Sequence, residues 1–159
     1  MPWWSVVPFT IANQRFAVPV ENVLKVLPAL LSTPLPGAPD TVIGLVDIRG
    51  QILPVIDLCR RFGWPSVPRS LWQPLIWLKT SRRELLLSVE TVGAVLACEQ
   101  EAFAPASDPN VPSVLLRGVM RSAEGMLLIQ DVEQLLSSVE EQRLAEALAK
   151  NGGARDESV

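Results

Sequence analysis

Two carboxylates, Asp57 and Asp131, and one thiol, Cys98, are the groups in this sequence that could do chemistry. Each aspartate opens a short segment of helical character, where a carboxylate commonly caps the helix and contributes about 1 kcal/mol. Gln134 follows Asp131 by three positions, as in a capping box. We interpret Asp57 and Asp131 as structural caps. A small hydrolase or transferase using them or Cys98 stays open, to be decided by the exposure and pKa of the Cys98 thiol.

The sequence contains no histidine, which removes the commonest general base and metal ligand. A histidine-activated serine or cysteine nucleophile and a histidine phosphoacceptor are excluded for the same reason. Cys59 and Cys98 form no Cys-x-x-Cys pair, so zinc and thioredoxin-like sites are not expected. We therefore predict no catalytic residue, no metal and no cofactor, and hence a protein that is not an enzyme.

The composition is that of one packed domain: 159 residues, 48% hydrophobic and 19% charged. A net charge of −3 gives no electrostatic reason to expect nucleic acid as a partner. No run reaches the ~20 apolar residues that span a bilayer, and the start does not resemble a signal peptide. We expect a cytoplasmic protein without direct membrane insertion, and solvated arginines at 60–61 and 82–83.

Short apolar runs separated by turns predict a mainly β protein. A hairpin is expected to turn at Arg49-Gly50, and helical turns are expected within 21–27 because Val23, Val26 and Leu27 have helical spacing. We also expect a proline-rich loop at 28–39, a short helix at 58–62, a linker at 66–70, a C-terminal helix at 132–150 and a flexible tail at 151–159.

An internal repeat organises these runs. The stretch from Gly44 to Leu58 aligns with that from Gly118 to Val132 at an offset of 74, and the stretch from Phe16 to Leu27 aligns with 85–96 at an offset of 69. We infer two related β units, about 1–66 and 67–131, whose strands can cross between the halves and whose sheets close on themselves.

The repeat separates structural residues from candidate binding residues. Asp57 and Asp131 recur in both copies, but Arg49 is matched by Ala123 and Gly50 by Glu124. The turn can therefore form without an arginine, whose guanidinium can bind a partner's carboxylate in bidentate fashion. The alternatives are a solubilising charge or an ion pair with Asp47.

Several stretches together resemble the CheW-like domain, in order, over about residues 6–140. They are Phe9-Thr10-Ile11 through Phe16-Ala17-Val18 to Val26, Pro36 to Pro39, Gly44 to Leu58, and Gly118-Val119 through Met126 to Leu136. The resemblance implies two SH3-like, five-stranded β-barrels with short connecting helices and a C-terminal α-helix, forming a single domain over 1–150. It also implies a non-enzymatic adaptor that binds the regulatory domain of a CheA-type histidine kinase and the helical tip of a chemoreceptor.

The family's arginine in its Asn-x-Arg-Gly turn maps onto Arg49, where it is linked to receptor binding, together with Gly50 and Asp47. The receptor-facing segment near the first short helix maps onto Val23 and Lys25. This chain departs from the family at Asp47, where asparagine is usual, and at Lys25, where an acidic residue is frequent. These departures suggest a non-standard chemosensory pathway. A competitor that binds a kinase or a receptor without coupling them stays open as an alternative.

Overall fold

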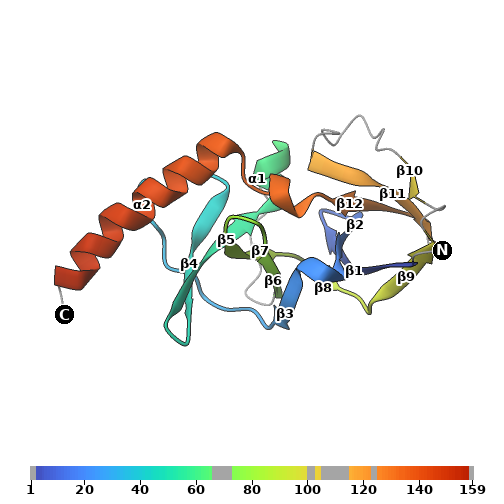
Figure 1. Ribbon diagram of the computed structural model, residues 1–159, viewed down its shortest axis with the longest axis horizontal. Helices are drawn as coiled ribbons and strands as arrows, with labels where there is room; N and C mark the ends of the chain where they lie inside the picture. Colours follow the sequence, from blue (N-terminus) through green and yellow to red (C-terminus); the bar gives the residue numbers. More distant parts are fainter. Residues whose placement is uncertain (1–2, 66–72, 100–102, 105–114, 123–124, 158–159) are drawn as a thin grey trace.

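The strands of this protein form two mixed, mainly antiparallel sheets that lie side by side (Figure 1). The computed structural model describes residues 3–65, 73–99, 103–104, 115–122 and 125–157; the predicted linker at 66–70 lies outside them. Sheet A has the order β10-β11-β12-β2-β1-β8, with β9 also paired to β1. Its strands are β1 (Trp3–Ile11), β2 (Gln14–Pro19), β8 (Thr91–Val92), β9 (Leu96–Glu99), β10 (Phe103–Ala104), β11 (Leu116–Ser122) and β12 (Gly125–Gln130).

Sheet B has five strands in the order β3-β6-β7-β5-β4. They are β3 (Val23–Leu27), β4 (Val42–Ile48), β5 (Gln51–Asp57), β6 (Leu75–Lys79) and β7 (Glu84–Ser88). The helical elements are the 3₁₀ turns η1 (Val20–Asn22) and η4 (Val132–Gln134) and the helices α1 (Leu58–Phe62) and α2 (Ser138–Glu157). The mainly β fold agrees with the sequence-based prediction.

The two sequence copies exchange their first hairpins. Sheet A combines β1 and β2 of the first copy with β8 to β12 of the second, while sheet B combines β6 and β7 with β3 to β5. A parallel pair joins the exchanged hairpin in each sheet, Ile129 with Ala17 in sheet A and Val55 with Leu86 in sheet B. These pairs are equivalent at the two repeat offsets. The sheets therefore do not divide the chain near residue 66.

Each sheet encloses a small apolar cluster of its own. Sheet A buries Val6, Ala17, Met120, Leu127 and Ile129. Sheet B buries the residues at the matching repeat positions, Leu75, Leu86, Val46, Leu53 and Val55. A fully buried aliphatic side chain larger than alanine contributes about 1.5–3 kcal/mol, and each copy supplies five of the ten residues in the two clusters.

A larger cluster joins the two sheets, because alternate residues of each strand point to opposite faces. It contains Phe9, Phe16 and Val18 from sheet A and Ile76 and Leu87 from sheet B. The Phe16 ring stacks on Phe9 at 5.7 Å and, across to α1, on Phe62 at 5.5 Å between ring centroids.

Closed barrels are not observed, because within the described residues no hydrogen-bonded ladder joins the two edges of either sheet. Both sheets nevertheless curl. Three residues separate β9 from β10, which lie at opposite edges of sheet A. In sheet B, Thr33 in the segment after the edge strand β3 forms an isolated bridge to Leu45 of the other edge strand, β4.

The helical turns predicted within 21–27 are wrong beyond Asn22, because Val23–Leu27 is strand β3. Its register against β6 shifts between Val23 and Lys25. A bulge of this kind places residues three apart on one face of a strand, so that Val23 and Val26 lie opposite Leu78 and Ile76. The bulge therefore accounts for the helix-like spacing of Val23 and Val26 in the sequence.

The predicted C-terminal helix at 132–150 is divided in two. Val132–Gln134 is the separate 3₁₀ turn η4, and α2 begins at Ser138 and continues to Glu157, through most of the expected tail. Ser137 Oγ accepts the Glu140 N–H at 3.1 Å, and the Glu140 carboxylate accepts the Ser137 N–H at 2.9 Å. This reciprocal capping box starts a new helix.

Two arginines predicted as solvated hold sheet B to the segment after β12. Arg61 Nε donates to the Gln134 carbonyl at 3.0 Å and lies 3.7 Å from Glu140, and Arg83 pairs with Glu141. Beside them, Ser81 N–H donates to the Glu133 carboxylate at 2.9 Å. These side chains are largely shielded from solvent, so salt screens their charges less than it screens those of an ordinary surface salt bridge.

Candidate partner-binding surface

The tip of the β4–β5 hairpin is a two-residue turn formed by Arg49 and Gly50. Their φ angles are +53° and +88°, and Ile48 pairs with Gln51 to close the hairpin. Two positive φ angles define a type I′ turn, which matches the twist of a hairpin and favours Asn or Gly at both positions. Asp47 Oδ1 accepts the Gly50 N–H at 2.8 Å and so stabilises the turn. The exposed Arg49 is an unusual choice for a left-handed position.

Strand β3 carries the other predicted site residues at an edge of sheet B. Val23 is half-buried and packs against the shared core, whereas Lys25 is exposed and pairs across to Trp77 of β6. The hairpin tip extends from β4, the opposite edge of the same sheet. The structure therefore places Val23 and Lys25 on one edge of sheet B and Asp47, Arg49 and Gly50 on the other, with residues 28–41 linking them.

Exposed aliphatic side chains are concentrated beside β3. Among the described residues, eight large hydrophobic side chains are exposed, and five of them fall within residues 20–31. They are Val20, Leu24, Val26, Leu30 and Leu31, and Leu31 reaches 83% exposure. We call this stretch the aliphatic segment. Clustered exposed apolar side chains are typical of protein-binding surfaces.

Sequence reasoning missed most of the aliphatic segment, although the repeat contained a signal for it. At the offset of 69, Leu24 corresponds to Gly93. The second copy thus builds its sheet without an aliphatic residue at this position, so the fold does not require one at Leu24.

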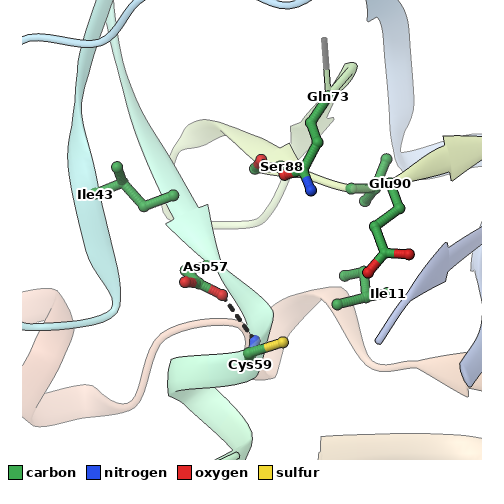
Figure 2. Close-up of a pocket in the computed structure, with 8 residues that line it drawn as sticks. Ile11, Ile43, Asp57, Cys59, Gln73, Ser88 and Glu90 are labelled. Atoms are coloured by element: carbon green, nitrogen blue, oxygen red, sulfur yellow. Dashed lines mark hydrogen bonds between the residues drawn. The ribbon is translucent and has the colours of Figure 1, made fainter. Parts of the chain in front are cut away.

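One of the candidate carboxylates, Asp57, lines a small cavity together with the thiol of Cys59 (Figure 2). The cavity of about 30 Å³ is lined by Asp57, Cys59, Ser88 and Glu90 among others. That volume holds about one or two water molecules but no substrate. Within the described part of the chain, no cluster of three or more His, Cys, Asp or Glu side chains could hold a metal ion.

Both candidate carboxylates cap helical turns, and the Cys59 thiol in the cavity is not activated. Asp57 Oδ1 accepts the Cys59 N–H at 2.9 Å as the N-cap of α1, and Asp131 accepts the Glu133 N–H at 3.1 Å as the N-cap of η4. Burial, followed by the charges of Asp57 and Glu90, raises the pKa of the Cys59 thiol to about 11. A thiol with this pKa stays protonated at neutral pH and is a poor nucleophile. Cys98 lies in β9, and its side chain is outside the described part.

The fold is a two-sheet β scaffold with an exposed hairpin tip at one edge of sheet B and exposed aliphatic side chains at the other. The model of the CheW-like domain matches residues 5–140, and the chain belongs to this family. None of the helices in the described part is both long enough and apolar enough to cross a membrane.

Relatives of the chain carry chemotaxis names. The chemotaxis protein CheW of Klebsiella aerogenes is 30% identical over 145 residues, which cover 90% of this chain and 87% of the relative. The protein FrzA of Myxococcus xanthus is 50% identical over 52 residues, covering 33% of this chain and 32% of FrzA. The crystal structure of the scaffolding protein TtCheW from Thermoanaerobacter tengcongensis has the same fold, with a TM-score of 0.79 at 23% identity. The match covers 88% of this chain and 91% of that one.

Proposed function

We propose that this chain is a non-enzymatic adaptor that couples a chemoreceptor to a CheA-type histidine kinase. The kinase would be held through its regulatory domain and the receptor through its cytoplasmic helical tip. The adaptor would act in the cytoplasm, at membrane-associated receptor arrays. Membership of the CheW-like family and the chemotaxis names of its relatives support this role.

The observation that carries the receptor site is the concentration of exposed aliphatic side chains beside β3, on the sheet that also carries the Arg49 tip. An amphipathic helix binds a groove through apolar residues at spacings of three and four, and a hairpin of two helices presents such residues repeatedly. Val23 and the aliphatic segment would contact that stripe.

Polar residues would set the orientation and choice of the partner. A guanidinium at an exposed tip can bind a carboxylate or the carbonyls at a helix end in bidentate fashion, and Lys25 adds a second cation. Asp47 and Lys25 replace the residues usual in the family, and we propose that they adapt the surface to a receptor of a non-standard chemosensory pathway.

The test is binding of full-length protein to a purified receptor cytoplasmic fragment and to a purified kinase regulatory domain. Arg49→Ala should lower receptor affinity by at least about tenfold, or roughly 1.4 kcal/mol, while kinase binding and thermal stability stay unchanged. Arg82→Ala is the matched control, because Arg82 is also exposed in a turn of sheet B. Wild-type receptor affinity in Arg49→Ala would refute the site.

A three-component pull-down tests the coupling itself. An adaptor recovers the receptor and the kinase together on one tagged chain. If adding one partner always displaces the other, the chain is a competitor and the coupling role is wrong.

A further inference from the structure

Helix α2 contacts the link between β3 and β4 through a single stripe of residues. Glu140, Leu144, Ala147 and Asn151 follow one another at spacings of four, three and four, which places them on one face of a helix. Glu141 and Leu148 are half-buried beside this stripe, and the other α2 residues up to position 150, including Ala145 and Ala149, are exposed. Figure 1 shows α2 lying beside sheet B and continuing beyond it.

The two ends of the stripe are hydrogen-bonded to Thr41 and Pro36, and its middle is buried in the shared core. Thr41 Oγ1, in a residue only 4% exposed, donates to Glu140 Oε2 at 2.7 Å. Leu144 and Ala147 are buried in the same cluster as Leu35. Asn151 Nδ2 donates to the Pro36 carbonyl at 3.3 Å.

The backbone at Gly37 also lies close to the helix. A methyl group built on Gly37 would lie 3.8 Å from Ala147 Cβ, an ordinary van der Waals contact. The apolar contacts of Leu144 and Ala147 therefore lie between two polar contacts, one at Glu140 and one at Asn151.

This link has little regular structure of its own. Its four prolines, at positions 28, 34, 36 and 39, carry no N–H group to donate. It is joined to β4 by the bridge between Thr33 and Leu45, whose two N–H···O distances are 2.8 and 2.7 Å, and to β5 by the Asp57 N–H, which donates to the Thr41 carbonyl at 2.9 Å. The bridge needs Gly44, because a Cβ there would lie 2.6 Å from the Thr33 carbonyl oxygen.

We propose that α2 is a buttress that positions residues 33–41 against β4, with Thr41, Glu140 and Asn151 as its positioning residues. The buttress keeps the Thr33–Leu45 bridge closed across the gap between the edges of sheet B. It thereby fixes the start of the β4–β5 hairpin relative to the aliphatic segment. The consequence for receptor binding rests on the proposed function, whereas the positioning itself is a property of the free chain.

Amide hydrogen exchange in the free, full-length protein tests the positioning. Ala147→Glu places a charge in the buried stripe, and Ala149→Glu places the same charge on the exposed face of the same helix. Ala147→Glu should accelerate exchange of the Thr33 and Leu45 amides by roughly tenfold or more, while the β1–β2 amides stay protected and Ala149→Glu matches wild type. Wild-type exchange at Thr33 and Leu45 in Ala147→Glu would overturn the proposal.

A second variant covers the case in which Ala147→Glu unfolds the whole chain and exposes the β1–β2 amides as well. Thr41→Val with Asn151→Ala removes the two hydrogen bonds and nearly conserves volume at the buried position. Faster exchange at Thr33 and Leu45 in this double variant supports the buttress, and unchanged exchange overturns it.

Receptor affinity separates the buttress from the binding site. The folded buttress variant should bind the receptor fragment several-fold more weakly, although none of its changes lies on the proposed surface. Wild-type affinity in that variant, beside lost affinity in Arg49→Ala, overturns the positioning role and leaves the proposed function standing. Wild-type affinity in both variants refutes the proposed receptor surface instead.

Discussion

Replacing Arg49 by glycine should make the protein slightly more stable while weakening its receptor binding. Arg49 has a φ of +53°, and a residue with a Cβ in this left-handed region carries a strain of about 1–2 kcal/mol. Glycine removes that strain but costs about 0.5–1 kcal/mol through the greater freedom of the unfolded chain. The net gain is about 0.5 kcal/mol, because the relief of strain exceeds the entropic cost.

Two variants of the same turn serve as references for this gain in stability. Arg49→Ala keeps the strain and should change the free energy of unfolding by less than about 0.5 kcal/mol. Gly50→Ala places a Cβ at a φ of +88° with no atom within 4 Å to clash, so that backbone strain alone should destabilise it by about 1–2 kcal/mol. The expected order of stability is Arg49→Gly, then wild type together with Arg49→Ala, then Gly50→Ala.

Urea unfolding followed by tryptophan fluorescence measures these differences, with equal slopes showing that the folded and unfolded states are comparable. For a chain of this length, 0.5 kcal/mol corresponds to about 1–2 °C in melting temperature. If Arg49→Gly and Arg49→Ala both lose more than about 1 kcal/mol, the arginine side chain stabilises the fold. The idea that it is retained for binding at the expense of stability would then be refuted.

Three further predictions concern the core and its titrating groups. In a Cys98→Ser background, Cys59 should resist alkylation at pH 8 until the chain is unfolded, because its thiol has a pKa of about 11; rapid labelling of the folded protein would contradict its burial. Burial raises the pKa of Glu140, but hydrogen bonds from Ser137 and Thr41 and the charge of Arg61 outweigh it, so the pKa lies below the ordinary 4.5. The stabilisation by the Glu140 carboxylate is complete above pH 4.5 and is lost as the pH falls through its folded-state pKa. Glu140→Gln should therefore reduce the fall of the melting temperature in acid. An unchanged dependence of melting temperature on pH below 4.5 would contradict this. Leu53→Ala and Leu127→Ala, at equivalent repeat positions, should each cost about 2–5 kcal/mol and differ little in urea unfolding, and a large difference would show that the two small cores are not equivalent.

The repeat made much of the fold predictable, because a position that recurs is held to the same role by the same packing. The β4–β5 hairpin and helix α1 follow from local turn and capping signals around Arg49-Gly50 and Asp57. The exchange of hairpins could not be derived in the same way. A sequence alignment relates equivalent positions but does not say whether Ala17 pairs within its own copy or with Ile129 of the other.

Two errors have local physical causes. The bulge at Leu24 turned a strand into an apparent helical pattern, because it changes the spacing of one face from two residues to three. The start of α2 was placed too early because the apolar residues Val132 and Leu135 continue the periodicity across a break. The Ser137-x-x-Glu140 capping box was readable in the sequence and would have corrected it.

The candidate site was only partly predictable. The Arg49 tip and the position of Lys25 follow from the resemblance, but the exposure of Leu24 and Leu31 depends on which faces the two sheets leave uncovered. That is a property of tertiary packing. Comparison of Leu24 with Gly93 of the second copy was the available clue, since exposed positions are where two copies of one fold are free to diverge.

The exchange of hairpins has a consequence for how the chain is made. The β1–β2 hairpin finds its parallel partner only when β12, residues 125–130, has been synthesised, whereas the strands of sheet B are complete once Ser88 has been added. Sheet B can therefore assemble first, and β2 remains unpaired on one side until β12 emerges. Truncation before residue 125 would leave that hairpin permanently exposed and prone to aggregation.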